Sequence, residues 1–326
     1  MAEILAVTFP FFALVLAGYL ATIRRWLPIE SIPGLNTFVL YFALPCLLYR
    51  FGSTTPIAQL LDIPLFLMYL FCALLMVGFV VMVSRNQRIG WNDAAFGALV
   101  AAFPNTGFMG VPLLVALLGA ASAGPAIVSI VVDLVITSSL CIALSRLDNA
   151  DQHGAREAGR QALKGVLINP MPWSILLGGI SSALQWRWPA PVAQTLGLLA
   201  DSASPVALFT IGAVLARSTL RAQISDSGTL PKRLPLRDYV PIAFIKLLVH
   251  PLLVLLVGSA AIQMGVAIDP FALMVVTLVA ALPSASNVSL LSERFGADTG
   301  RIARIILLST AVAFLTFSGF VAVLKG

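Results

Sequence analysis

The chain has 326 residues and a mean hydropathy of +0.98; 59% of the residues are hydrophobic, 10% are charged, and the formal net charge is +6. A soluble protein carries about 25% charged residues, so this sequence has too few polar side chains to cover a surface in water. Its positive charge lies in short loops between apolar runs, which is typical of a membrane protein and excludes nucleic acid as an expected partner.

Ten apolar runs that are long enough to cross a bilayer as helices follow one another along the chain. We therefore predict an all-α membrane protein with ten transmembrane helices, over residues 3–23, 33–50, 62–84, 92–118, 124–145, 165–183, 192–216, 239–263, 270–292 and 302–324. Most Lys and Arg residues lie in the loops that follow the odd-numbered spans. The positive-inside rule makes those loops cytoplasmic, so we expect a multi-pass protein of the plasma (inner) membrane with both termini outside.

Prolines divide the two halves of the chain at corresponding places. Pro45 in span 2 corresponds to Pro205 in span 7, and Pro104 in span 4 corresponds to Pro283 in span 9. A repeat with five spans must lie upside down relative to its copy, and inverted repeats are typical of secondary transporters. The predicted domains are a first five-helix repeat, a cytoplasmic linker and a second, inverted five-helix repeat, over residues 1–146, 147–164 and 165–326.

Two short polar segments, Pro104–Gly107 and Pro283–Asn287, interrupt spans 4 and 9 near their centres. Backbone that leaves a helix inside a bilayer is tolerated only where it is buried in protein or lines a cavity. We therefore expect spans 4 and 9 each to consist of two half-helices, and the two spans to cross at the middle of the membrane. The second half-helices should begin near Phe108 and Asn287. The two segments also supply residue types that cap helix starts, namely Asn105, Thr106, Ser284 and Ser286.

The amino ends of the second half-helices carry partial positive charge, which favours a small anion such as a carboxylate. The candidate substrate-binding residues of the two segments are Pro104, Asn105, Thr106, Gly107, Pro283, Ser284, Ser286 and Asn287. Gly107 would let a ligand or a neighbouring helix approach closely. The alternative is that Pro and Gly are common in membrane helices and that Asn105 only hydrogen-bonds freed carbonyls, but two breaks at equal depth favour a binding site.

The segments Phe103–Leu113 in span 4 and Ala280–Gly296 in span 9 resemble the signature segments of the auxin efflux carrier family. The resemblance extends over nearly the whole chain, with further matches at Leu44–Leu47, Asn169–Pro170 and Pro205–Gly212. It implies a ten-span fold of two inverted five-helix repeats, with a scaffold and a transport domain that contains the crossing helices.

The same resemblance implies transport of small organic anions, which are auxin in plants and malonate or malate among bacterial members, and it implies a homodimer as a frequent state. Asn105 matches the asparagine that contacts the substrate carboxylate in this family. Asn169, near the start of span 6, matches a second polar contact. The loop over residues 146–164 is short, as in bacterial members, so auxin is not the expected substrate.

Three titratable side chains lie inside predicted spans and are candidates for coupling or for holding charge: Asp133, Lys246 and His250. Asp133 could carry a proton, bind a cation or pair with a base, or it could be a hydrogen-bonded contact between helices. Lys246 could attract an anion or pair with Asp133, but we expect its long side chain to extend to the cytoplasmic surface. We expect His250 to be a hydrogen-bonded core residue, although its titration near neutral pH would suit a proton relay.

These patterns predict a secondary carrier of small organic anions that works by alternating access, with the substrate at the crossing of spans 4 and 9. The alternative is a sodium- or proton-coupled symporter or antiporter of the bile-acid/sodium symporter type. An enzyme is not expected, because no motif supplies catalytic residues, and we predict no metal site and no cofactor. The patterns leave the substrate, the transport direction, the coupling ion (H+ or Na+) and the oligomeric state open.

Overall fold

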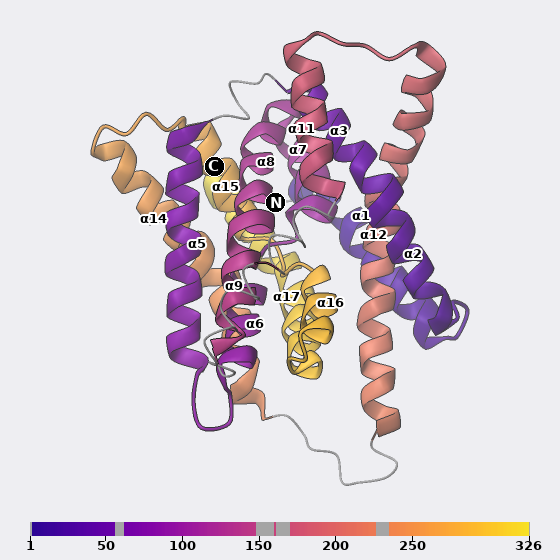
Figure 1. The fold of residues 1–326 in the computed structure, drawn as a ribbon, viewed down its shortest axis with the longest axis vertical. Coiled ribbons are helices and arrows are strands. Elements are labelled where there is room, and N and C mark those ends of the chain that lie inside the picture. Colours follow the sequence, from indigo (N-terminus) through magenta and orange to yellow (C-terminus); the bar gives the residue numbers. More distant parts are fainter. Residues whose placement is uncertain (1, 56–61, 148–159, 161–169, 226–234, 326) are drawn as a thin grey trace. The chain divides into compact units, whose positions relative to one another are not determined.

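The computed structural model describes residues 2–55, 62–147, 160, 170–225 and 235–325 (Figure 1). Every regular element in these residues is a helix, so the expected all-α class is confirmed for the described chain. The described residues form two compact units. Unit 1 draws on residues 1–61, 107–127 and 170–233, and unit 2 draws on residues 62–106, 128–169 and 234–326.

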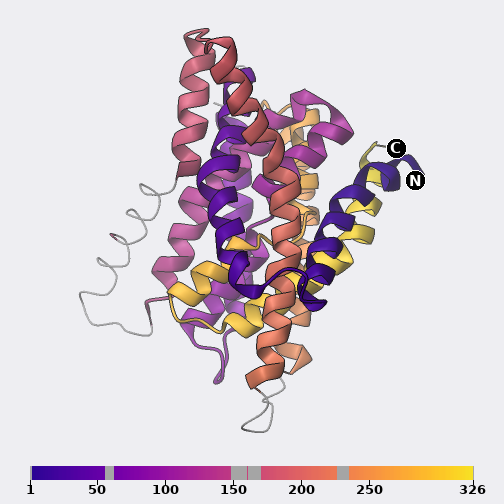
Figure 2. The same ribbon diagram turned by 90° about the vertical axis from the view of Figure 1, so that its right-hand side faces the viewer.

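Unit 1 takes the first helices from each half of the chain together with the segment over residues 107–127. In order, its elements are α1 (Ala2–Ile23), η1 (Ile29–Ser31), α2 (Ile32–Phe38), the π-helical segment η2 (Val39–Ala43), α3 (Leu44–Thr54), α7 (Val111–Leu118), η4 (Ala120–Ser122), α11 (Pro170–Ala183) and α12 (Ala190–Ser225). The 36-residue α12 continues through Pro205 without a break, and its full length is visible in Figure 2. Packing against neighbours holds this helix together although the proline removes one backbone donor.

Unit 2 contains the remaining helices, again from both halves of the chain. Its elements are α5 (Ile63–Ser84), α6 (Trp91–Ala102), the π-helical segment η5 (Val132–Thr137), α9 (Ser138–Leu144), η7 (Leu236–Asp238), α13 (Val240–Phe244), the π-helical segment η8 (Ile245–Val249), α14 (His250–Gln263), α15 (Pro270–Ala280), α16 (Asn287–Arg294) and α17 (Thr299–Lys325). The π-helical η3 (Thr106–Gly110) and the helix α8 (Ala123–Val131) lie at the chain positions where the two units meet in sequence. The predicted repeats are a different division of the chain, so the two repeats stay a prediction.

Seven described segments are long and apolar enough to cross a membrane. They are Ile4–Ile23, Ile29–Thr54, Ile63–Ser84, Ala120–Leu144, Ala190–Arg217, Val240–Gln263 and Thr299–Leu324. These segments correspond to predicted spans 1, 2, 3, 5, 7, 8 and 10. Spans 4 and 9 are divided into shorter pieces, which include the apolar helices Thr106–Leu118 and Pro270–Ala280. The described part of span 6 is only the 14-residue α11, so the total of ten stays a prediction.

Large apolar side chains point outward on the long helices of unit 2. Met82 on α5 is 80% exposed, Leu256 on α14 is 68% exposed, and Leu315 on α17 is 70% exposed. Helices that are apolar on their outer face as well as their inner face are typical of membrane spans. The arrangement agrees with the composition, in which apolar residues outnumber what a core could bury.

Glycines set the close approach of helices in unit 1. α1 packs along α12, and a Cβ atom on Gly212 of α12 would collide with the Val15 carbonyl of α1. A Cβ on Gly18 of α1 would collide in the same way with the Phe209 carbonyl of α12. Small residues at such contacts let membrane helices pack backbone against backbone.

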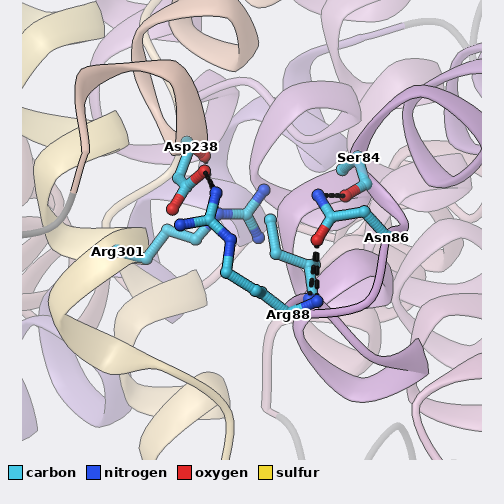
Figure 3. A network of polar contacts seen from close by, with 6 residues as sticks. Ser84, Asn86, Arg88, Asp238 and Arg301 are labelled. Atoms are coloured by element: carbon cyan, nitrogen blue, oxygen red, sulfur yellow. Dashed lines mark hydrogen bonds and ion pairs between the residues drawn. The ribbon is translucent and has the colours of Figure 1, made fainter.

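A polar network joins three loops at one end of unit 2 (Figure 3). The Asn86 side chain accepts the Arg88 backbone N–H at 2.8 Å, and Arg88 Nη2 lies 3.2 Å from Asp238 Oδ1. Arg301, which is only 2% exposed, donates from Nε to the Asp238 carbonyl at 2.7 Å and from Nη1 to the Asp93 carbonyl at 2.8 Å. One guanidinium therefore ties the starts of α6, α13 and α17 together.

The glycine contact predicts that Gly212→Val destabilises unit 1. Overpacking of a tight contact costs about 1–3 kcal/mol, so the apparent melting temperature of the detergent-purified protein should fall by several degrees. Gly197→Val on the same helix is the matched control, because a Cβ there meets no atom within 4 Å. Equal melting temperatures of the two variants would contradict this account of the α1–α12 contact.

The Arg301 contacts predict that Arg301→Lys also destabilises the fold, although it keeps the charge. A lysine has no planar fork with which to reach two carbonyls, and each buried carbonyl left without a donor costs about 1–3 kcal/mol. The control is Arg304→Lys, because Arg304 instead lies over the ring of Tyr239 at 5.8 Å. Thermal unfolding monitored by tryptophan fluorescence should separate the two variants, and a loss no larger than that of the control would contradict the role given to Arg301.

Candidate functional site

The two predicted breaks are present, and their backbones bond to each other. α6 ends at Ala102 and α15 ends at Ala280. Beyond these ends, Asn105 N–H donates to the Pro283 carbonyl at 2.9 Å and Ala285 N–H donates to the Phe103 carbonyl at 3.0 Å, so that Pro104 and Ser284 form an isolated antiparallel bridge. Backbone groups that the broken helices leave unpaired thus find partners in each other.

The second halves begin close to the predicted positions. Helical backbone after Asn105 starts with the π-helical η3 at Thr106, two residues before Phe108, and continues as the α-helix α7 from Val111. Pro112 lies in the first turn of α7, directly after the π-helical η3, and removes one backbone donor from the helical run Thr106–Leu118. In the other break, α16 begins at Asn287 as predicted.

The expected capping by side chains is not what the structure shows at these helix starts. Ser286 occupies the N-cap position of α16 but makes no side-chain cap bond. Ser284 instead receives a hydrogen bond at its hydroxyl from Ser309 Oγ of α17 at 3.2 Å, and Thr106 Oγ1 donates back to the Pro104 carbonyl at 3.5 Å. The bridge sets the direction of these side chains, which therefore serve the loop conformation and not the helix ends.

The side-chain amide oxygens of asparagines in both breaks are left without partners. Asn105 is 4% exposed, and its Oδ1 is buried with no hydrogen-bond partner; Asn287 Oδ1 is also buried with none. A buried polar atom without a partner is costly and is found where a ligand completes the site. An amide can turn by half a rotation and present its NH2 group instead, so each side chain can meet a donor or an acceptor.

The other predicted site residues have varied surroundings. Thr106 and Ser284 are buried, at 0% and 1% exposure. A Cβ on Gly107 would meet only Leu44 Cδ2, at 3.9 Å, so the glycine is not required by a neighbouring helix in unit 1. Asn169 lies outside the described residues. None of these positions shows by itself that a substrate binds.

Asp133 lies in the π-helical segment η5 and is completely buried. Its carboxylate accepts hydrogen bonds from Tyr69 Oη of α5 at 3.2 Å and from Thr137 Oγ1 at 3.3 Å. Sequence reasoning missed both donors. Thr137 could have been found because it follows Asp133 by one helical turn, whereas the pairing with Tyr69 depends on how α5 packs against η5.

Lys246 contradicts the expectation that its side chain extends to the cytoplasmic surface. It lies in the π-helical segment η8, is 0% exposed, and points inward. Its Nζ lies 3.0 Å from His250 Nδ1 and donates to the Ala280 carbonyl at 3.0 Å. Lys246 therefore makes these bonds in place of the direct pair with Asp133 that was considered. His250 is a buried, hydrogen-bonded residue, as predicted.

The bond to Ala280 explains why an ammonium group is buried here. In a continuous helix the Ala280 carbonyl would accept the N–H of Ser284, four residues later. Because the helix breaks, Ser284 N–H donates to Ser309 Oγ at 3.3 Å instead, and Lys246 takes its place at the carbonyl. The lysine thus caps the carboxyl end of α15, where the helix dipole also favours a cation.

We expect Lys246→Met to destabilise unit 2, because the Ala280 carbonyl would be left buried without a donor. The cost of one such carbonyl is about 1–3 kcal/mol. Leu247→Met is the control, since it introduces the same residue next to Lys246 in the same π-helical segment at a site that is only 1% exposed. Thermal melting in detergent should rank the variants, and a Lys246→Met protein as stable as the Leu247→Met protein would contradict the capping role.

Comparison with known proteins places the chain among transporters. The model of a family described as "Membrane transport protein" matches residues 4–321. A protein of Rhizobium meliloti (strain 1021) named "Putative malonate transporter" is 26% identical over 331 residues, which cover 100% of this chain and 97% of the relative. An uncharacterized transporter of Methanothermobacter thermautotrophicus is 25% identical over 93% of this chain and 92% of the relative. The uncharacterized transporter YfdV of Escherichia coli (strain K12) is 25% identical over 89% of this chain and 88% of the relative.

Proposed function

Because the chain belongs to the membrane transport protein family, which is the auxin efflux carrier family that its motifs resemble, we propose that it is a secondary active carrier of small organic anions. The seven long apolar helices and the transporter relatives make it a multi-pass integral membrane protein. The family and these relatives are named as transporters and not as enzymes. In the proposed mechanism, the substrate binds where the two helix breaks pair and reaches each side of the membrane in turn.

The observation that carries this proposal is the pair of unpartnered amide oxygens at the paired helix breaks. Asn105 and Asn287 come from segments that are far apart in sequence, and each keeps a buried amide oxygen without a partner. The bridge between Pro104 and Ser284 brings the backbones of these two segments together. Irregular backbone and polar groups inside an apolar protein are typical of the binding site of a secondary transporter.

A small carboxylate fits the chemistry of these groups. α16 begins at Asn287, and the amino end of a helix carries partial positive charge, although the N–H groups of Val288 and Ser289 already donate to the Ala285 and Ser286 carbonyls. The NH2 groups of Asn105 and Asn287 add donors that suit carboxylate oxygens. Since one relative is named as a malonate transporter, malonate is the first substrate to test.

We extend the proposal to a ten-span fold of two inverted repeats. Unit 1 takes residues 1–61 from the first half and 170–233 from the second, which are the first two predicted spans of each repeat. Unit 2 takes spans 3, 8, 9 and 10, most of span 5 and the first part of span 4, whereas the second part of span 4 belongs to unit 1. The shared placement of the first two spans of each half supports the repeat, and the orientation with both termini outside rests on the distribution of basic residues.

Replacement of Asn105 by Ala should weaken substrate binding and transport. A lost hydrogen bond to a charged group costs about 1.5–3 kcal/mol, which corresponds to a decrease of roughly tenfold to a hundredfold in affinity. Uptake of radiolabelled malonate into proteoliposomes at subsaturating concentration should fall by that factor, and the malonate concentration that gives a set rise in melting temperature should increase by it. Bound ligand stabilises only the folded protein, so the thermal shift reports binding separately from transport.

Asn36→Ala on α2 is the matched control and should leave uptake and the thermal shift at wild-type values. A panel of mono- and dicarboxylates extends the measurement beyond malonate. Wild-type protein that neither takes up nor is stabilised by any member of the panel would contradict the anion carrier. Undiminished uptake of every transported anion by Asn105→Ala would contradict the location of the site.

A further inference from the structure

Five side chains from three helical regions form a buried polar cluster in unit 2, which we call the Lys246 cluster. Its members are Tyr69, Asp133, Thr137, Lys246 and His250, and each is at most 1% exposed. The ring of His250 lies 6.3 Å from that of Tyr69 between centroids, and this contact connects the Asp133 side of the cluster to the Lys246 side. Ionisable groups buried at membrane depth are rare and are found in proton relays and ion pathways.

The polar network of the cluster contains one buried ring nitrogen without a partner. His250 Nε2 is buried and has no hydrogen-bond partner, although His250 Nδ1 is engaged with Lys246. Three of its members, Asp133, Thr137 and Lys246, also lie in π-helical segments, which occur mostly as local insertions and frequently at functional sites. A fully satisfied structural network would need neither feature.

The cluster is bonded to the backbone of the proposed substrate site. Lys246 Nζ holds the Ala280 carbonyl, and only three residues later Pro283 accepts the N–H of Asn105. A change of charge in the cluster therefore acts on the same segment that would contact the anion. Coupling between sites needs such a continuous chain of contacts.

We propose that the Lys246 cluster binds one proton with each anion, on the carboxylate of Asp133, which would make the protein a proton–anion symporter. The inference rests on the proposed function. With Asp133 ionised, Lys246 protonated and His250 neutral, the formal charge of the cluster is zero. A proton on Asp133 makes the cluster positive, and this charge offsets a negative charge of the anion bound nearby.

This offset gives the direction of coupling. An uncompensated charge is expensive to hold in an apolar medium, so the interior of unit 2 accommodates the anion and the proton together better than either alone. The only covalent changes are the formation of one O–H bond on Asp133 on one side of the membrane and its cleavage on the other. The proton comes from water and returns to water, and it moves in the same direction as the anion.

The groups around the cluster favour a proton over Na+. The Asp133 oxygens already accept bonds from two hydroxyl groups, and the ammonium of Lys246 lies in the same cluster and would repel a second cation. Among the described residues, no group of three or more His, Cys, Asp or Glu side chains could hold a metal ion. A proton needs only one oxygen or nitrogen atom.

Few other titratable groups face the cluster from the helices packed against it. The thiols of Cys72 on α5 and Cys141 on α9 lie near Tyr69 and Asp133. α15 carries no titratable side chain, and α6 carries only Asp93 in its first turn. α17 carries Arg301, Arg304 and Lys325. Arg301 bonds the backbone of Asp93 in the loop network described above, away from the cluster.

The test uses the full chain in proteoliposomes that contain a trapped pH-sensitive dye, with Na+ absent. Addition of malonate should cause proton influx, and an inward proton gradient should drive malonate accumulation. An Na+ gradient without a proton gradient should drive none. Malonate uptake without proton influx, or uptake driven by Na+, would overturn the inference while leaving the anion carrier intact. No uptake and no stabilisation by any carboxylate would instead overturn the proposed function and the inference with it.

Asp133→Asn distinguishes coupling from folding, because the amide resembles a permanently protonated carboxyl group. The ratio of proton influx to malonate exchange should fall at least tenfold relative to wild type. Asp201→Asn is the control, since the Asp201 side chain is 68% exposed and pairs with Arg50 in unit 1, and its ratio should equal that of wild type. An unchanged ratio in Asp133→Asn would overturn the assignment to Asp133. If this variant fails to fold, the wild-type measurement decides the question alone.

Discussion

The structure of unit 2 depends on how two interrupted helices satisfy their backbone groups in an apolar interior. Water is not available there to replace lost helical bonds, so each freed N–H and carbonyl must find a protein partner. The bridge between Phe103–Asn105 and Pro283–Ala285 provides two such bonds, and Lys246 and Ser309 provide two more. Lys246 lies on η8 and Ser309 lies on α17, so the breaks fix the position of helices that carry no break themselves.

The need for these partners also explains the composition of the cluster. A carbonyl at the end of α15 needs a donor, and an ammonium is a strong one, but it introduces a positive charge into a buried region. Asp133 supplies a negative charge in the same region, although Tyr69 and Thr137 occupy its oxygens. Asp133 and Lys246 therefore each have hydrogen bonds of their own.

Sequence reasoning found the features that depend on local chemistry. Proline cannot donate a backbone bond, so the ends of α6 and α15 and the start of α16 follow from Pro104, Pro283 and the polar residues beside them. The role of Lys246 could not be found in this way. Near a helix end a lysine normally reaches the surface, and its inward direction depends on a carbonyl that a break 34 residues later leaves free. The roles of Ser286 and Ser309 were likewise decided by tertiary packing.

The division of the chain into units gives the position of these groups its functional meaning. Asn105, Pro283, Asp133 and Lys246 all belong to unit 2, whereas unit 1 is held by glycine contacts between α1 and α12 that exclude side chains. In the proposed alternating access, one rigid part of a transporter moves against another. If unit 2 is the body that carries the anion, a proton bound in its interior travels with the anion as part of the same body. Coupling then needs no signal between units, because the two charges share one packed interior and are offset within it.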